Sequence, residues 1–130
     1  VRTFAPAMIE KHRGSIVNIS GGNGGTGGDG PYGASKEGVR NLTLTLASEL
    51  KKFNIAVNAL HPAQPRSAGY EEQVAARAEM GVYVQPPVRI EAHWPLMRMF
   101  AEQDAAGGLT GKLLDIREWN LEHGLGGFAE

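Results

Sequence analysis

Two short strand-like segments with a long helical segment between them most constrain the fold of this chain. Residues 15–20 are rich in β-branched side chains and are bounded by glycines. Apolar residues then recur at helical spacing from Pro31 to about Lys52. Residues 55–60 repeat the strand signature and end at His61-Pro62. Strand, helix and strand in this order predict a right-handed parallel crossover and therefore an α/β fold.

Further segments flank this crossover unit on both sides. An irregular segment that leaves the carboxyl end of a strand in such a sheet is a usual place for a lid over a ligand. The predicted elements are a helix over 1–11, a lid over 63–87 with a polar helical stretch at 70–80, a helix over 90–103, a strand over 112–116 and an irregular tail over 117–130. The helix over 90–103 is expected to carry Trp94, Met97 and Phe100 on one face.

Composition limits the possible partners and compartments. The 13 basic and 14 acidic residues give a net charge of −1 without a basic cluster, which argues against nucleic acid as a partner. No apolar run approaches the roughly 20 residues of a membrane span and no segment resembles a secretion leader, so a cytoplasmic protein away from membranes is expected. The chain has no cysteine and its four histidines lack ligand spacing, so no metal site is predicted. Because it opens on Val1, we expect a piece of a longer protein.

The most informative pair of side chains for chemistry is Tyr32 and Lys36. A tyrosine four residues before a lysine shares one helical face with it. The ammonium then favours the phenolate, which lets the hydroxyl exchange protons near neutral pH, as a general acid/base must. On spacing alone, a packed ring beside a solvated lysine is the commoner meaning of such a pair. The residues around it decide between the two.

The glycine-rich run at 22–27 offers a competing interpretation. It matches the G-x-G-x-x-G dinucleotide fingerprint and lies between a strand and a helix. However, four residues, 28–31, separate its last glycine from the helix, and the next strand ends in Leu60-His61 without the acidic residue that would hold a ribose. We therefore do not interpret this run as the fingerprint.

Four motifs in order carry a resemblance to a known family. They are Gly14-Ser15-Ile16-Val17-Asn18-Ile19-Ser20, Tyr32-Gly33-Ala34-Ser35-Lys36, Val57-Asn58-Ala59-Leu60-His61-Pro62 and Leu109-Thr110-Gly111-Lys112. In this order they resemble the carboxyl-terminal half of a short-chain dehydrogenase/reductase. The resemblance covers about residues 1–116. It implies a single partial Rossmann-like domain over residues 1–130, with about three strands of a doubly wound parallel sheet and flanking helices.

The resemblance also implies roles for individual residues. Tyr32 would be the catalytic acid/base and would also contact the cofactor. Lys36 would favour the ionised form of Tyr32 and bind the nicotinamide ribose of NAD or NADP. After the second strand, the family has Pro-Gly and then a threonine that touches the nicotinamide. Here Pro62 and Ala63 stand at the first two positions and Ser67 at the threonine's place, so these three residues are predicted to bind the cofactor.

The family's catalytic serine has no secure counterpart. Aligning the strand places Gly21 at its position, whereas counting back from Tyr32 by the family's spacing reaches Ile19. Ser20 lies between them, and we predict it as the hydroxyl that polarises the substrate, with Asn23 or Thr26 as substitutes. The competing interpretation is that Ser20 only ends its strand.

Two functions follow from the resemblance. The first is an NAD(P)-dependent oxidoreductase that interconverts a carbonyl and a secondary alcohol, of which this chain would be the catalytic half and inactive alone. The second is a non-catalytic domain of the same fold that binds a ligand or assembles as a subunit. In the family, the helix over 31–52 commonly packs against a symmetry mate, so a homo-oligomer (dimer or tetramer) is expected. Alone, the strand over 15–20 would present an open parallel edge.

Overall fold

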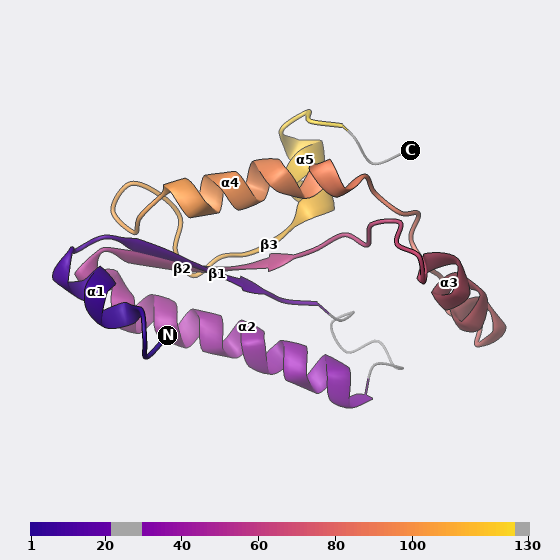
Figure 1. Ribbon diagram of the computed structural model, residues 1–130, viewed down its shortest axis with the longest axis horizontal. Coiled ribbons are helices and arrows are strands. Elements are labelled where there is room, and N and C mark those ends of the chain that lie inside the picture. The colour runs from indigo at the N-terminus through magenta and orange to yellow at the C-terminus, as the bar shows by residue number, and fades with distance from the viewer. Residues whose placement is uncertain (22–29, 127–130) are drawn as a thin grey trace.

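The sheet forms the centre of the molecule. The computed structural model describes residues 1–21 and 30–126, and its parallel strands lie in the order β1 (Gly14–Ile19), β2 (Ile55–His61) and β3 (Leu113–Asp115) (Figure 1). Gly14 pairs with Ile55 at the start of β1, and His61 pairs with Asp115 at the end of β3. The predicted α/β fold with three parallel strands is therefore confirmed.

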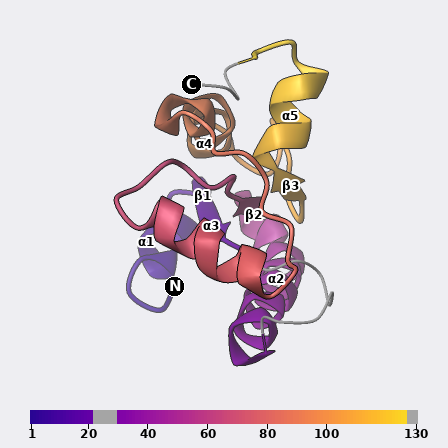
Figure 2. The ribbon, with the colours of Figure 1, turned by 90° about the vertical axis from the view of Figure 1, so that its right-hand side faces the viewer.

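Helices cover both faces of this sheet. They are α1 (Ala5–Glu10), α2 (Gly30–Leu50) with a 3₁₀ turn η1 (Lys51–Phe53), α3 (Tyr70–Glu79), the 3₁₀ turn η2 (Ile90–His93), α4 (Trp94–Glu102) and α5 (Ile116–Glu122). The helices α1 and α2 lie on one face, and α4 and α5 lie on the other. Helix α3 lies beyond the carboxyl end of β2, away from both layers (Figure 2). The segment that was predicted to be a lid therefore leaves the sheet at the carboxyl end of β2.

A separate apolar cluster fills each interface between sheet and helices. Ala47 and Leu50 of α2 pack on Ile55 and Val57 of β2. On the opposite face, the buried residues of the second cluster are Leu60, Ala63, Val88, Ala92, Leu96, Phe100 and Ile116. All of β2 except its last residue is buried, because this central strand is covered on both faces and both edges. Apolar burial at roughly 25 cal/mol per Å² makes these two clusters the main source of stability.

Polar side chains fix the turn that leads into β3. The side chain of Asn58 donates to the Leu109 carbonyl at 2.8 Å and accepts from the Lys112 amide at 3.0 Å. The Thr110 hydroxyl accepts from the Val57 amide at 3.1 Å. Asn58 is fully buried, so these bonds satisfy groups that would otherwise be costly to bury. They set the position of β3 and of the residues at its end.

Three expectations about helices were wrong. The tail predicted to be irregular contains α5, because the Asp115 carboxylate accepts from the Arg117 and Glu118 amides and caps that helix. The first helix begins at Ala5, just before Pro6, and not at Val1.

The third error concerns the buried face of α4. Leu96 and Phe100 are fully buried, whereas Trp94 and Met97 are exposed. Leu96 and Phe100 are four residues apart and therefore form the stripe that faces the sheet. Trp94 and Met97 lie outside that stripe, and only Phe100 of the three predicted residues belongs to the core.

Strand β1 lies at an edge of the sheet, as predicted. Among the described residues it pairs only with β2, and its side chains are half-buried or exposed. The side chain of Asn18 is anchored on α2 through a 3.0 Å bond to the Thr43 hydroxyl. The Ser20 amide continues the pairing by donating to the Leu60 carbonyl at 2.8 Å. The chain thus enters the site region from a strand that is open on one side.

Candidate active site

Tyr32 and Lys36 lie together at the start of α2, next to the end of β1. The Lys36 ammonium donates to the Ile19 carbonyl at 3.2 Å and lies 5.6 Å from the centre of the Tyr32 ring. Tyr32 is 55% exposed, so its hydroxyl is accessible to a ligand. The strand end therefore holds the lysine in place beside the tyrosine.

Gly21 lies directly against this pair. A β-carbon built at Gly21 would come within 2.9 Å of the Tyr32 hydroxyl oxygen and within 3.6 Å of two carbons of Lys36. The position that aligns with the family's serine is thus the one that points at the tyrosine hydroxyl. A hydroxyl-bearing side chain at residue 21 would reach that oxygen, and glycine supplies none.

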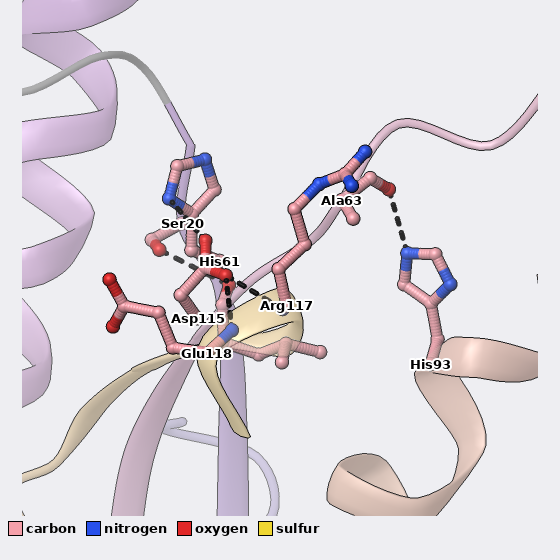
Figure 3. Close-up of polar contacts among 8 residues, drawn as sticks. Ser20, His61, Ala63, His93, Asp115, Arg117 and Glu118 are labelled. Carbon is pink, nitrogen blue, oxygen red and sulfur yellow. Dashed lines mark hydrogen bonds and ion pairs between the residues drawn. The ribbon is translucent and has the colours of Figure 1, made fainter. Parts of the chain in front are cut away.

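Ser20 makes a different contact. It is buried, and its hydroxyl donates to the Leu60 carbonyl on β2 at 3.1 Å. Figure 3 shows this bond beside His61 and Asp115 (Figure 3). The structure gives Ser20 no contact with Tyr32 or Lys36 among the described residues. The predicted substitutes, Asn23 and Thr26, and the glycine-rich run at 22–27 lie outside the described residues.

A cavity of about 300 Å³ opens at the carboxyl ends of β2 and β3. The residues that line it are His61, Pro62, Ala63, Gln64, Arg77, Tyr83, Val84, Gln85, Asp115 and Arg117. It includes Pro62 and Ala63, which were predicted to bind a cofactor. Ser67 is exposed and is not among the lining residues. The strand ends thus bring Pro62 and Ala63 into one cavity and leave Ser67 outside it.

A buried histidine holds the backbone at Ala63. The Nε2 atom of His93 lies 2.8 Å from the Ala63 carbonyl oxygen, and its Nδ1 lies 3.0 Å from the Ile90 carbonyl oxygen. These contacts tie the wall of the cavity to the turn η2. Sequence reasoning missed His93, because its partner is a backbone group 30 residues away.

Sequence reasoning also missed the charged residues of the cavity. His61 Nδ1 lies 3.4 Å from Asp115 Oδ2, and Arg117 donates to the Pro86 carbonyl. Arg77 comes from the last turn of α3. Because these side chains belong to the ends of four separate elements, β2, β3, α3 and α5, only the folded sheet brings them together. One sequence pattern, an Asp followed three residues later by a Glu at Asp115 and Glu118, indicates a helix start and could have located α5 and its Arg117.

The donors at this site fit a dinucleotide cofactor. Lys36 uses one of its three N–H bonds on the Ile19 carbonyl, which leaves donors for ribose hydroxyls. The cavity beside Pro62 and Ala63 gives room for a ring. Among residues 1–21 and 30–126, no group of three His, Cys, Asp or Glu side chains is placed to hold a metal ion. No helix in that part of the chain is long and apolar enough to span a membrane.

Together, the parallel sheet and the helices on both of its faces define a Rossmann-like α/β protein. The sequence profile of the short chain dehydrogenase family matches residues 1–77. The chain belongs to the short chain dehydrogenase family.

Known proteins of this family align with most of the chain. Fluoren-9-ol dehydrogenase from Terrabacter sp. is 35% identical over 99% of this chain and 40% of its own length. The structure of a 3-oxoacyl-[acyl-carrier protein] reductase with bound NAD from Brucella melitensis is 27% identical, with a TM-score of 0.64 over 88% of this chain and 43% of that one. A structure from Beutenbergia cavernae with NADP bound at low occupancy is 30% identical, with a TM-score of 0.69 over 88% and 49%. The chain therefore spans less than half the length of these relatives.

Proposed function

We propose that this chain is the catalytic half of an NAD(P)-dependent oxidoreductase that interconverts a carbonyl and a secondary alcohol. The contact that carries the proposal is the Lys36 ammonium, held between the Ile19 carbonyl and the Tyr32 ring. Family membership supports it, as do the relatives named as dehydrogenases and reductases. Structures with bound NAD and with bound NADP support a cofactor of either kind.

In this proposal Tyr32 moves the proton. Its hydroxyl gives a proton to the carbonyl oxygen in reduction and takes one from the alcohol in oxidation. Lys36 stabilises the phenolate that remains after the proton has left. Lys36, Tyr32, Pro62, Ala63 and Ser67 would hold a nicotinamide cofactor, which when bound would supply or accept the hydride. Because Gly21 has no β-carbon, the Tyr32 hydroxyl can lie against the chain at that position, where a β-carbon would come within 2.9 Å of its oxygen.

Ser20 remains the predicted polarising hydroxyl, under one condition. Its Oγ must turn away from the Leu60 carbonyl, to which it donates at 3.1 Å, before it can bond to a substrate. Leaving that carbonyl costs about 1 kcal/mol. Ser20→Ala tests the role: a loss of turnover with unchanged affinity for the cofactor supports it, and unchanged turnover excludes it.

A second function has its own supporting observation. Glycine at residue 21 leaves the Tyr32 hydroxyl without a neighbouring side-chain hydroxyl at that position. Leu42 and Leu44 of α2 are 50% and 45% exposed, on opposite sides of the buried stripe of that helix. Both features favour a binding or assembly domain of the family, and the exposed leucines also support a homo-oligomer. A cytoplasmic location stays a prediction.

The first test is cofactor binding by the 130-residue chain. NADH and NADPH are titrated against it by fluorescence, with Lys36→Ala as the test variant. Lys112→Ala is the matched control, because this exposed lysine precedes β3 at the other end of the sheet. Saturable binding that is lost only in Lys36→Ala supports the nicotinamide site. Equal binding by both variants contradicts the role of Lys36.

The second test concerns chemistry. We would fuse this chain to the amino-terminal part of the Terrabacter fluoren-9-ol dehydrogenase and measure turnover of fluoren-9-ol. Tyr32→Phe is expected to lower kcat by about 10²- to 10⁴-fold, because general acid/base catalysis contributes that much. Its NADH affinity should stay unchanged. Full turnover by the variant would show that Tyr32 is not the acid/base, whereas a folded fusion without any turnover would favour the non-catalytic function.

A further inference from the structure

The cavity at the ends of β2 and β3 contains a histidine and a carboxylate that lie side by side. His61 is the last residue of β2, Asp115 is the last residue of β3, and the two are paired in the sheet. His61 Nδ1 lies 3.4 Å from Asp115 Oδ2, and both residues line the cavity. Because side chains alternate between the two faces of a strand, paired positions on neighbouring strands point to the same face. The register of the sheet therefore holds this pair together.

The Asp115 carboxylate is fixed by its second role as the cap of α5. Its Oδ1 accepts from the Arg117 and Glu118 amides at 2.7 and 3.2 Å, which leaves Oδ2 to face His61. A carboxylate beside Nδ1 favours the imidazole tautomer that carries its proton on Nδ1, and it also orients the ring. Asp115 therefore acts as a positioning residue for His61.

The second ring nitrogen of His61 has no such partner. Within residues 1–21 and 30–126, Nε2 makes no hydrogen bond and no ion pair, and the side chain is 34% exposed. Figure 3 shows the ring at the ends of the strands, with one nitrogen on Asp115 and the other directed away from it. A neutral imidazole with its proton on Nδ1 has a lone pair on Nε2 and accepts a hydrogen bond there. The cavity wall thus offers an oriented acceptor to a ligand.

We propose that His61, oriented by Asp115, is a specificity-determining residue of this cavity and accepts at Nε2 a hydrogen bond from a hydroxyl or N–H group of the ligand. A ligand without a donor at this place would leave the lone pair unpaired in an enclosed site, so the histidine discriminates between ligands. A volume of about 300 Å³ suits a small polar molecule or one end of a larger ligand.

The inference rests on the proposed function, because His61 directly precedes Pro62 and Ala63 of the proposed cofactor site and shares the cavity with them. The donor group belongs either to the substrate or to the carboxamide of the nicotinamide. The two sources offer the same chemistry to Nε2, and the experiment separates them.

The first measurement determines the tautomer of His61 directly. Nitrogen NMR of the 130-residue chain distinguishes a ring nitrogen that carries a proton from one that carries a lone pair, at about pH 8, where a free imidazole is neutral. We expect the lone pair on Nε2 in the parent chain. In Asp115→Asn the amide oxygen can keep the cap of α5 while the amide N–H group faces Nδ1, so the proton should move to Nε2. A merely structural role of Asp115 would not move it. A proton on Nε2 in the parent chain overturns the proposal.

The second measurement identifies the donor with two matched pairs of probes. Hydroxyacetone and 2-butanone differ only in a terminal hydroxyl or methyl group. NADH and its reduced 3-acetylpyridine analogue differ in an amide or an acetyl group, and only the amide can donate. Each probe is titrated by calorimetry against the parent chain, His61→Phe and His123→Phe, and in the parent chain the Nε2 signal is followed as well. His123 is the matched control, because it is an exposed histidine at the end of α5 that does not line the cavity.

The expected result is that the donor-bearing member of at least one pair binds roughly fivefold more tightly than its partner, as one hydrogen bond allows. His61→Phe removes this preference, and His123→Phe keeps it. A preference in the ketone pair alone assigns the donor to the substrate, and a preference in the NADH pair alone assigns it to the cofactor.

Two results overturn the proposal. One is equal binding within both pairs, or no response of the Nε2 signal to any of the four probes. The other is a preference that persists in His61→Phe. The first comparison is made in the parent chain, so misfolding of a variant cannot produce it.

These outcomes are independent of the proposed chemistry. The tautomer of His61 is measured without cofactor or turnover, so a proton on Nε2 leaves the Tyr32→Phe and Lys36→Ala results to be judged separately. Conversely, a ketone preference that depends on His61, in a chain that does not bind NADH, supports the histidine site and favours the non-catalytic function.

Discussion

The Tyr32 hydroxyl lies so close to Gly21 that a β-carbon there would be 2.9 Å from its oxygen. Residue 21 therefore sets the space around the proposed catalytic oxygen. The neighbouring Ser20 hydroxyl makes a different contact, because it donates to the Leu60 carbonyl on β2. The two residues after β1 thus have separate roles, one open to the site and one bonded within the sheet.

Substitution at Gly21 should alter turnover in the fused enzyme. Gly21→Ala forces the tyrosine hydroxyl to shift, and we expect turnover to fall by about tenfold or more, since small misplacements of a reacting group are costly. Gly21→Ser should recover part of that loss, because its hydroxyl can bond to Tyr32. Gly38→Ala, where a β-carbon has nothing within 4 Å, is the control and should keep full turnover. If Gly21→Ala turns over as fast as the parent, the close approach of Gly21 to the Tyr32 hydroxyl is not needed for catalysis.

Removal of the Asn58 side chain should destabilise the fold. Asn58→Ala leaves the Lys112 amide without its partner and removes one of the two bonds to the Leu109 carbonyl, which also accepts from Gln103 at 2.9 Å. A buried unsatisfied group costs about 1 to 3 kcal/mol. The free energy of unfolding, measured with urea, should fall by about that amount, and the midpoint should move to a lower urea concentration. The control is Asn41→Ala on the exposed side of α2, which should stay within about 0.5 kcal/mol of the parent. A matching loss in both variants would contradict the role of Asn58.

The turn after α4 should weaken in acid. The backbone bond from Gly107 is the main cause that lowers the pKa of the Asp104 carboxyl below its ordinary value of 3.8, and the Asn54 side chain adds to it. A lowered pKa means that the ionised form is favoured in the folded state. Its stabilisation is therefore present above pH 3.8 and is lost as the pH falls through the folded-state value.

Hydrogen exchange of the Gly107 amide measures this effect. Its protection should fall in that acid range in the parent chain, where the amide donates to Asp104 at 2.9 Å. Asp104→Asn should show flatter dependence on pH, since an amide oxygen accepts the bond but does not ionise. Identical acid profiles in the two proteins would assign the effect to other groups.

The exposed leucines of α2 should control self-association. If the chain forms the predicted homo-oligomer through α2, Leu42→Asp together with Leu44→Asp places charges on two exposed sides of the helix, and we expect a monomer. Both side chains are about half exposed, so the folded chain itself should lose little stability. Sedimentation measures the mass. Met80→Asp on the segment after α3, at 69% exposure, is the control and should leave the mass unchanged.

The strands were predictable because their signals are local. Residues 15–20 and 55–60 are short, β-branched and bounded by turn residues, and both formed strands within a residue of the expected bounds. The tail helix was missed although Asp115 and Glu118 carry the pattern of a helix start. Its apolar residues, such as Ile116 and Trp119, pack in the core cluster on the sheet. That packing depends on contacts between distant parts of the chain, which the local sequence of the tail does not reveal.

The site was predictable only in part, for the same reason. Tyr32 and Lys36 are four residues apart, so helical spacing alone brings them together. Arg77 and Arg117 meet through the sheet and the lid, and no spacing along the chain relates them. The sequence assigned Gly21 to the serine position only through the alignment of the strand. The structure is needed to show that residue 21 faces the Tyr32 hydroxyl, because this depends on how α2 lies beside β1.

The open edge of β1 has a further consequence for how the sheet can grow. Two copies related by a twofold axis through this edge would place their β1 strands antiparallel, because the axis reverses strand direction. A strand joined to β1 within one polypeptide through a helical crossover would instead run parallel to it. The direction of pairing at β1 therefore distinguishes a sheet extended by a second copy from one completed by its own chain.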